Sequence, residues 1–126
     1  MKIAKVESFL MSCPLPAPLK LKFWNGERTI LKRDAMILRV TADNGQKGWA
    51  PGPAHERAAQ EIRNTIAPFL IGRDPLQWKT FGFQGELEVS KTYHAVEVAV
   101  MDLVARLEDR PLSEVAGGRV RDTIKC

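Results

Sequence analysis

Hydrophobic positions follow two different periods along the chain. In the first part they alternate with polar positions, as in Met36, Leu38 and Val40, and this alternation is typical of a half-buried β-strand. The segments predicted as strands are residues 2–11, 35–41 and 47–50. Asp43-Asn44-Gly45 separates the last two and is a strong hairpin signal. The three strands are therefore predicted to form an antiparallel sheet.

The connection between the first two predicted strands is long. Pro14, Pro16 and Pro18 lack backbone N–H donors and should end the first strand, and a new periodic pattern begins only at about Asp34. We therefore predict an extended loop of roughly 20 residues, whereas most connections in compact domains have about four to six. Its unusual length makes this loop a candidate functional element.

From about residue 53 the apolar positions follow the period of a helix. The residues at helical spacings of four, four and three are Ala58, Ile62, Ile66 and Phe69. They predict an amphipathic helix that has Pro53 near its first position, is ended or kinked at Pro68 and stops at Gly72. Asp74-Pro75 has the form of an N-cap followed by proline and predicts a second, shorter helix.

A third helix is predicted from about Glu88 to Leu107. Between Ala95 and Ala105 only Glu97 and Asp102 are polar, so its apolar surface is wider than the stripe of about 100° that a surface helix shows. The sheet can cover one side, and the two shorter helices are poor candidates for the other. We therefore expect either self-association through this helix or further polypeptide beyond residue 126. A short helical turn at 111–115 and a lead-in to another strand at 120–126 complete the predicted elements.

Length and composition favour one compact domain. The chain has 126 residues, of which 44% are hydrophobic and 27% charged, a size at which one hydrophobic core can form without disulfides. The longest apolar runs, at 35–38 and 98–101, are far too short to span a membrane, and the N-terminus resembles no signal peptide. We expect a cytoplasmic protein without a membrane partner, in which Cys13 and Cys126 are reduced thiols.

The chain carries few signs of catalytic chemistry. Its net charge of +4 is too small to indicate a nucleic-acid partner. Glu97 and Asp102 are five residues apart on a helix and so lie on different faces, which excludes them as an acid–base pair, whereas Asp102 and Arg106 suit an i,i+4 ion pair. His55 and His94 are far apart in sequence without an acidic cluster. We therefore predict no catalytic residue and no metal ligand in this chain.

Several local motifs occur in an order that is familiar as a set. They are Ile37-Leu38-Arg39-Val40-Thr41-Ala42-Asp43-Asn44-Gly45 with Gly48-Trp49 after it, the Ile71-Gly72-Arg73-Asp74-Pro75 turn, the helix from His94 to Leu107, Arg110-Pro111-Leu112 and Gly117-Gly118. In this order the chain resembles the N-terminal capping domain of the mandelate racemase and muconate lactonizing enzyme branch of the enolase superfamily. The resemblance spans essentially the whole chain.

The resemblance implies an α+β fold, a three-stranded antiparallel β-meander followed by a helical bundle, with the (β/α)-barrel domain of the family absent. Residues 1–118 would be the capping domain and 119–126 the lead-in to the first barrel strand. In the family, a proton is removed next to a carboxylate, and Mg²⁺ on three acidic ligands of the barrel holds the resulting enediolate. The chain would thus be an inactive fragment without a cofactor, and its parent a magnesium-dependent isomerase or lyase of the racemase, cycloisomerase or sugar-acid dehydratase type.

The family's capping domain also supplies two mobile loops that close over the active site and sort substrates. By position they correspond to residues 14–26 and 49–55. The substrate-binding candidates taken from them are Leu19, Lys22, Phe23, Trp24, Trp49, Pro51 and His55. We expect a small carboxylate substrate, with the barrel and further copies of the chain as partners in a homo-oligomer. Many family members have Gly-Glu after the third strand, whereas this chain has Trp49-Ala50-Pro51-Gly52, so this loop indicates no particular substrate.

Each of these candidates also has a simpler interpretation. Trp49 fits a core aromatic residue, His55 a solvated or helix-capping histidine, and the lysines of Lys20-Leu21-Lys22 a solvated pair. The alternative function is a stand-alone binding or assembly module. In that case the basic aromatic segment from Lys20 to Arg33 would bind an anionic partner.

Overall fold

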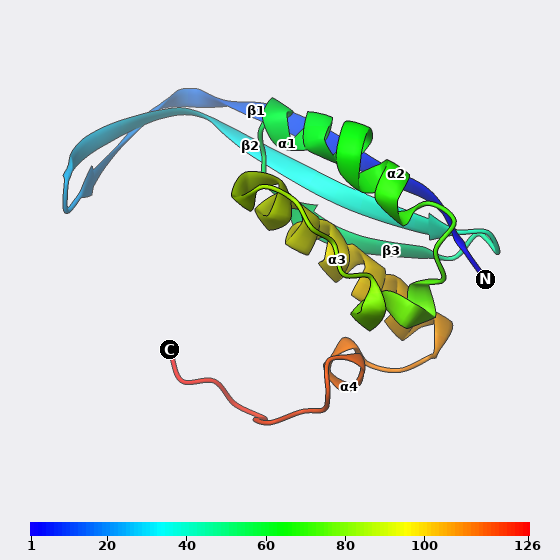
Figure 1. Ribbon diagram of the computed structural model, residues 1–126. Helices are drawn as coiled ribbons and strands as arrows, with labels where there is room; N and C mark the ends of the chain where they lie inside the picture. The colour runs from blue at the N-terminus through cyan, green and yellow to red at the C-terminus, as the bar shows by residue number, and fades with distance from the viewer.

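The computed structural model describes residues 1–126 as one sheet covered on one face by helices (Figure 1). Strands β1 (Ile3–Phe23), β2 (Gly26–Ala42) and β3 (Lys47–Gly52) form a three-stranded antiparallel sheet in the order β1-β2-β3. Alternate residues of β2, namely Met36, Leu38 and Val40, are buried on the covered face, because side chains alternate between the two faces of a strand. The predicted α+β fold and strand order are confirmed.

The first helical segment runs without interruption through α1 (Glu56–Glu61), the π-helix η1 (Ile62–Ile66) and α2 (Ala67–Leu70). In η1 the N–H of Ala67 donates to the carbonyl of Ile62, five residues back. The wide turn directly precedes Pro68, which has no N–H and cannot continue a regular α-helix without distortion. The disruption predicted at Pro68 takes the form of this wide turn just before it, and Gly72, at a φ of 88°, ends the segment.

Asp74 caps the next helix as predicted. Its Oδ1 accepts a hydrogen bond from the N–H of Leu76 at 3.0 Å and so begins the 3₁₀-helix η2 (Pro75–Thr80). Helix α3 (Leu87–Leu107) follows and lies across the covered face of the sheet, where it packs on β2 and β3.

The wide apolar surface of α3 is covered mostly from within the chain. The sheet and the α1–η1 segment bury Val96, Ala99 and Leu103 in the main core. Helix α4 (Leu112–Val115) folds back so that Val115 packs on Val104 and Ala105, together with Trp78 of η2. The expectation that the shorter helices could not cover this surface was therefore wrong, because each one covers a different part of it. Val98 is the large apolar residue of this stretch that stays exposed, at 41%.

The long loop predicted after residue 13 is instead a β-hairpin. Beyond the helical layer β1 and β2 continue as a two-stranded ribbon with its turn at Trp24-Asn25 (Figure 1); we call residues 14–32 the arm. Pairing runs to Pro14 and Lys32, breaks, and resumes with Leu19 and Ile30. Four residues of β1 therefore lie opposite one residue of β2. Pro16 and Pro18 fall in this irregularity, where no ladder hydrogen bond requires their missing N–H groups.

Two further expectations concern the chain as a whole. Cys13 and Cys126 are both exposed and free, as predicted. No helix has the length and apolar character needed to cross a membrane.

Candidate functional site

A hollow of about 470 Å³ lies where the arm joins the body and α1 begins. The residues that line it are Leu10, Met11, Ser12, Lys32, Asp34, Ala54, His55 and Glu56. It therefore brings Lys32 of the arm together with Ala54 and His55 of the second candidate loop, whereas none of residues 14–26 lines it. His55 is the predicted candidate found in its lining.

Two charged groups of the hollow, Lys32 and Asp34, are paired with each other, and Glu56 is paired with Arg63 outside the lining at 3.7 Å. Asp34 lies 3.1 Å from the ammonium group of Lys32. A hydrogen bond to Ser12 and the contact with Lys32 lower the pKa of Asp34. A carboxylate with a lowered pKa is a poor proton acceptor, so this arrangement suits binding and orientation rather than proton abstraction.

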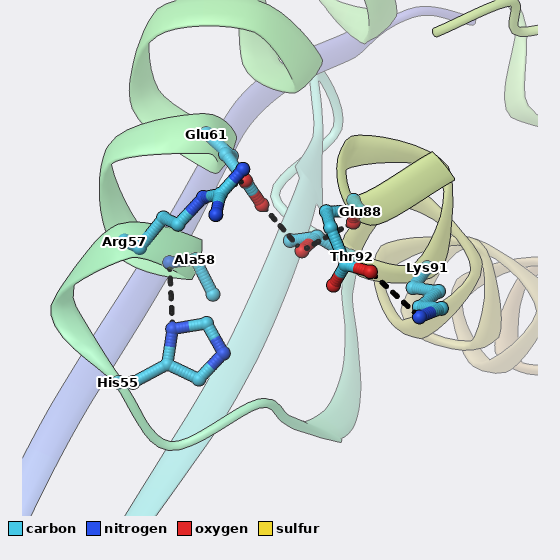
Figure 2. A network of polar contacts seen from close by, with 7 residues as sticks. All are labelled: His55, Arg57, Ala58, Glu61, Glu88, Lys91 and Thr92. Carbon is cyan, nitrogen blue, oxygen red and sulfur yellow. Dashed lines mark hydrogen bonds and ion pairs between the residues drawn. The ribbon is translucent and has the colours of Figure 1, made fainter. Parts of the chain in front are cut away.

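His55 caps the N-terminus of α1. Its Nδ1 accepts a hydrogen bond from the N–H of Ala58 at 3.1 Å, as Figure 2 shows. The neutral ring therefore carries its proton on Nε2. The helix-capping interpretation is confirmed, and Nε2 is left as a donor at an exposed position beside the hollow.

A polar network fixes α1 against the start of α3 (Figure 2). Glu61 lies 3.1 Å from Nε of Arg57 and accepts a hydrogen bond of 2.6 Å from the hydroxyl of Thr92 on α3. Next to it, Lys91 and Glu88 form an ion pair at 2.7 Å, which lowers the pKa of Glu88. Because the hydrogen bond joins Glu61 at the end of α1 to Thr92 near the start of α3, it fixes the helix that His55 caps against the body.

The arm has two distinct faces. The cross-strand pairs Leu19 with Ile30, Leu21 with Arg28 and Phe23 with Gly26 share one face, because directly paired residues point to the same side of an antiparallel ribbon. Lys20 and Lys22, paired with Thr29 and Glu27, share the other. Trp24 lies in the turn and is 98% exposed. The predicted candidates Leu19 and Phe23 are thus together, and Lys22 is on the opposite face.

Trp49 and Pro51 lie away from the hollow, on the uncovered face of the sheet. Pro51 is paired with Ile37, and Trp49 with Arg39. The guanidinium of Arg39 lies 5.4 Å from the Trp49 ring and 4.8 Å from the Phe9 ring. Trp49 is 40% exposed there, so it is not a core aromatic residue. The structure therefore separates these two candidates from His55.

The uncovered face also holds a charged cluster around Glu7. Its carboxylate lies 2.7 Å from both Lys5 and Arg39. The hydrogen bonds and charges of these two cations lower the pKa of Glu7, and the hydrogen bond from Lys5 is the largest cause.

Glu97 and Asp102 of α3 serve separate structural purposes. Asp102 accepts hydrogen bonds from the backbone N–H of Trp49 at 2.8 Å and from Nε of Arg106 at 2.9 Å, which confirms the predicted ion pair and ties α3 to β3. Glu97 contacts His94 at 3.3 Å. No three His, Cys, Asp or Glu residues are grouped so that they could hold a metal ion.

Sequence reasoning missed Ser12, Lys32 and Asp34, which line the hollow. Their positions follow from the pairing of β1 with β2. A segment interpreted as a loop does not predict which of its side chains point to the same side. The apolar residues Leu19, Leu21 and Phe23 do alternate with Lys20 and Lys22, and this alternation was the one available signal.

The chain matches a family model described as mandelate racemase / muconate lactonizing enzyme, N-terminal domain, over residues 6–117. Among curated relatives, it is 28% identical to a chloromuconate cycloisomerase of Pseudomonas putida, covering 98% of this chain and 36% of that enzyme. It is 27% identical to the L-Ala-D/L-Glu epimerase of Bacillus subtilis, covering 99% of this chain and 36% of that enzyme. It is 29% identical to a D-galactonate dehydratase family member of Streptomyces bingchenggensis, covering 73% of this chain and 25% of that protein.

Solved structures have the same fold. A member of the enolase superfamily from Polaromonas matches with a TM-score of 0.78 at 26% identity, covering 96% of this chain and 34% of that one. A muconate lactonizing enzyme from Pseudomonas fluorescens matches with a TM-score of 0.75 at 22% identity, covering 96% and 35%. The chain thus spans about a third of the length of these proteins.

Proposed function

Because the chain belongs to the N-terminal domain family of the mandelate racemase and muconate lactonizing enzymes, we propose that it is the substrate-capping domain of an enzyme that abstracts a proton next to a carboxylate. Residues 1–118 form the cap, and 119–126 lead into a barrel domain. The chain alone has no turnover. The complete enzyme is a cytoplasmic homo-oligomer.

One observation carries this proposal. Lys32 at the base of the arm and the start of α1, which are separate in the sequence, line one hollow at one end of the molecule. The arm leaves the body at that end (Figure 1), and His55 is held beside it by its hydrogen bond to Ala58. A domain that supplies two converging segments without catalytic groups is suited to close over a substrate bound elsewhere and to exclude water from it.

Magnesium does not fit the residues of this chain. Oxygen ligands from several carboxylates would have to converge, and the acidic side chains here are paired with cations or dispersed. We therefore assign the ion to the barrel, where it would polarise the substrate carboxylate. A related structure from Roseovarius nubinhibens, 23% identical, is complexed with magnesium.

The substrate is proposed to be a small carboxylic acid whose far end touches the cap. The relatives named above include a cycloisomerase, an epimerase and a dehydratase, so the reaction is an isomerisation or an elimination that starts with removal of an α-proton. Leu19, Phe23 and Trp24 of the arm and His55 are the residues of this chain proposed to contact the substrate first. Lys22, Trp49 and Pro51 contact it only if closure reorients their segments.

The test compares the complete reading frame with the 126-residue chain. Both proteins are incubated with Mg²⁺ in deuterated water and a panel of α-protonated acids: a muconolactone, an alanyl-glutamate dipeptide and a galactonate. Exchange of the α-proton is followed by nuclear magnetic resonance. We expect exchange in at least one acid with the complete protein and in none with the short chain. Exchange by the short chain at a rate equal to that of the complete protein would contradict the proposal.

A further inference from the structure

We propose that Asp102 is a positioning residue of the cap. Its carboxylate holds the start of the segment 49–55 on α3, and this segment carries His55 to the hollow. The inference rests on the proposed function, because it assigns Asp102 a part in holding the surface that meets the substrate. Asp102 does not line the hollow itself, so it acts through the segment that it holds.

Asp102 binds the backbone of an edge strand. Strand β3 lies at the edge of the sheet, so alternate N–H groups along it have no partner strand. The N–H of Trp49 points away from the sheet and donates to Oδ2 of Asp102 at 2.8 Å. The same oxygen accepts a hydrogen bond from Nε of Arg106, one turn further along α3, at 2.9 Å. Arg106 thereby restricts the rotation of the carboxylate that holds Trp49.

Close packing of α3 on β3 keeps this contact short. Gly48 precedes Trp49, and a Cβ atom there would overlap backbone atoms of Ala99 and Leu103. Asp102 is three residues after Ala99, and residues at this spacing lie on the same side of a helix. The helix and the strand are therefore in backbone contact where Asp102 binds, and the strand has little freedom to shift there.

Only a short and stiff stretch separates Trp49 from His55. Pro51 and Pro53 fix two φ angles and restrict the residues that precede them. The N–H of His55 donates to the carbonyl of Pro53 at 2.9 Å, and the His55 ring caps α1. A displacement of Trp49 would therefore be carried to His55 rather than absorbed between them.

The same helix holds the far end of this part of the chain. Glu61, at the end of α1, accepts a hydrogen bond of 2.6 Å from the hydroxyl of Thr92, a buried residue of α3. Residues 49–61 are thus attached to α3 at both ends, by Asp102 and by Thr92. A segment held in this way keeps His55 in one position before and after a substrate binds, which lowers the entropic cost of binding.

Glu97 provides the matched control for Asp102. The two side chains lie on the same helix and are 28% and 23% exposed, but the partner of Glu97 is His94 of α3 itself. Asp102→Leu removes the acceptor and keeps the bulk of the side chain. Asp102→Asn keeps an acceptor oxygen for the N–H of Trp49, and Glu97→Leu removes a carboxylate that holds no strand.

The kinetic experiment uses the complete enzyme and the acid whose α-proton the wild type exchanges. We expect Asp102→Leu to raise KM by about 10-fold and to keep kcat within about 3-fold, because the reacting groups lie in another domain. Asp102→Asn and Glu97→Leu should keep both constants within about 3-fold. A purely structural Asp102 would instead lower the amount of folded enzyme, and therefore the apparent kcat, and leave KM unchanged.

Amide hydrogen exchange measures the attachment of the segment without turnover. In the complete enzyme without substrate, peptides that cover residues 49–55 should exchange at least about 10-fold faster in Asp102→Leu than in wild type. The same peptides should exchange at the wild-type rate in Asp102→Asn and in Glu97→Leu.

An unchanged KM in Asp102→Leu, or a raised KM with unchanged amide exchange over 49–55, would overturn the role of Asp102 and leave the proposed function standing. Effects of equal size in Asp102→Leu and either of the other variants would also overturn it. Absence of α-proton exchange by the wild-type enzyme with every acid would overturn the proposed function, and with it the part of Asp102 in holding the substrate.

Discussion

Gly48 is a residue at which the backbone of α3 approaches the sheet closely. A Cβ atom there would overlap the carbonyl oxygen of Ala99 and the amide nitrogen of Leu103, and would lie 2.6 Å from the Leu103 Cβ. Two of these contacts are with backbone, which cannot rotate away. A glycine within this short strand is therefore explained by the helix that packs on it.

Gly48→Ala is expected to lower the free energy of unfolding by about 3 kcal/mol, because overpacking against backbone has no cheap relaxation. Gly52→Ala is the matched control on the same strand. Its Cβ would meet the Met36 sulfur at 2.8 Å and Leu38 side-chain atoms, which can move, so a loss of about 1 kcal/mol or less is expected. Urea unfolding of both variants measures the difference, and equal losses would contradict this account of α3 packing.

Tyr93 gives a prediction for the alkaline range. Its ring stacks on Phe83 with 4.3 Å between centroids and meets Phe69 edge to face. Burial, and to a smaller extent the charge of Glu97, raise the pKa of Tyr93 to about 12. The neutral phenol therefore favours the folded state. This contribution is complete below the unfolded pKa of about 10 and is lost as the pH rises through about 12.

The chain has a single tyrosine, so the absorbance of the phenolate reports on Tyr93 alone. We expect a midpoint near 12 in the folded protein and near 10 in urea. Circular dichroism at each pH shows whether the protein is still folded. A midpoint near 10 with an intact fold would show that the ring is not buried as described, and Tyr93→Phe should abolish the signal.

At the scale of elements, the helices could be predicted well and the arm could not. Local signals determine where the helical segments are interrupted, end and begin. The π turn lies just before Pro68, the first segment ends at Gly72, and Asp74 caps the next helix. The prolines of the arm indicate a loop under the same local rules. The ribbon forms nevertheless because the pairing of β1 with β2 resumes after the irregularity, and such pairing depends on a partner that local patterns do not identify.

The arm is expected to contribute little to the stability of the body. None of residues 14–32 is buried. Replacing them by Asn-Gly, which joins the paired residues Cys13 and Arg33 by a two-residue turn, should change the free energy of unfolding by less than about 1 kcal/mol. Urea unfolding at neutral pH measures this change. A loss of more than about 2 kcal/mol or a broadened transition would mean that the arm belongs to the core.

At the scale of the whole molecule, the candidate site was predicted only in part. The sequence and the family resemblance indicated the two loops 14–26 and 49–55, and the structure brings His55 to a hollow that only Lys32 of the arm reaches. It also places Trp49 on the other side of the sheet. Neighbours in a strand point to opposite faces, so a range such as 49–55 combined residues that the fold separates. Only the register of β1 with β2 shows which face of the arm meets the hollow.

The central claim is that this chain caps an active site whose chemistry lies in another domain. The most direct test is to sequence the coding DNA beyond the codon for Cys126. The account predicts an open frame of about 250 further residues, the size of a (β/α)-barrel, with a lysine or histidine base and three acidic residues at the ends of successive predicted strands. A stop codon directly after Cys126 would contradict it, and the exposed basic arm would then be the surface to investigate as a binding module.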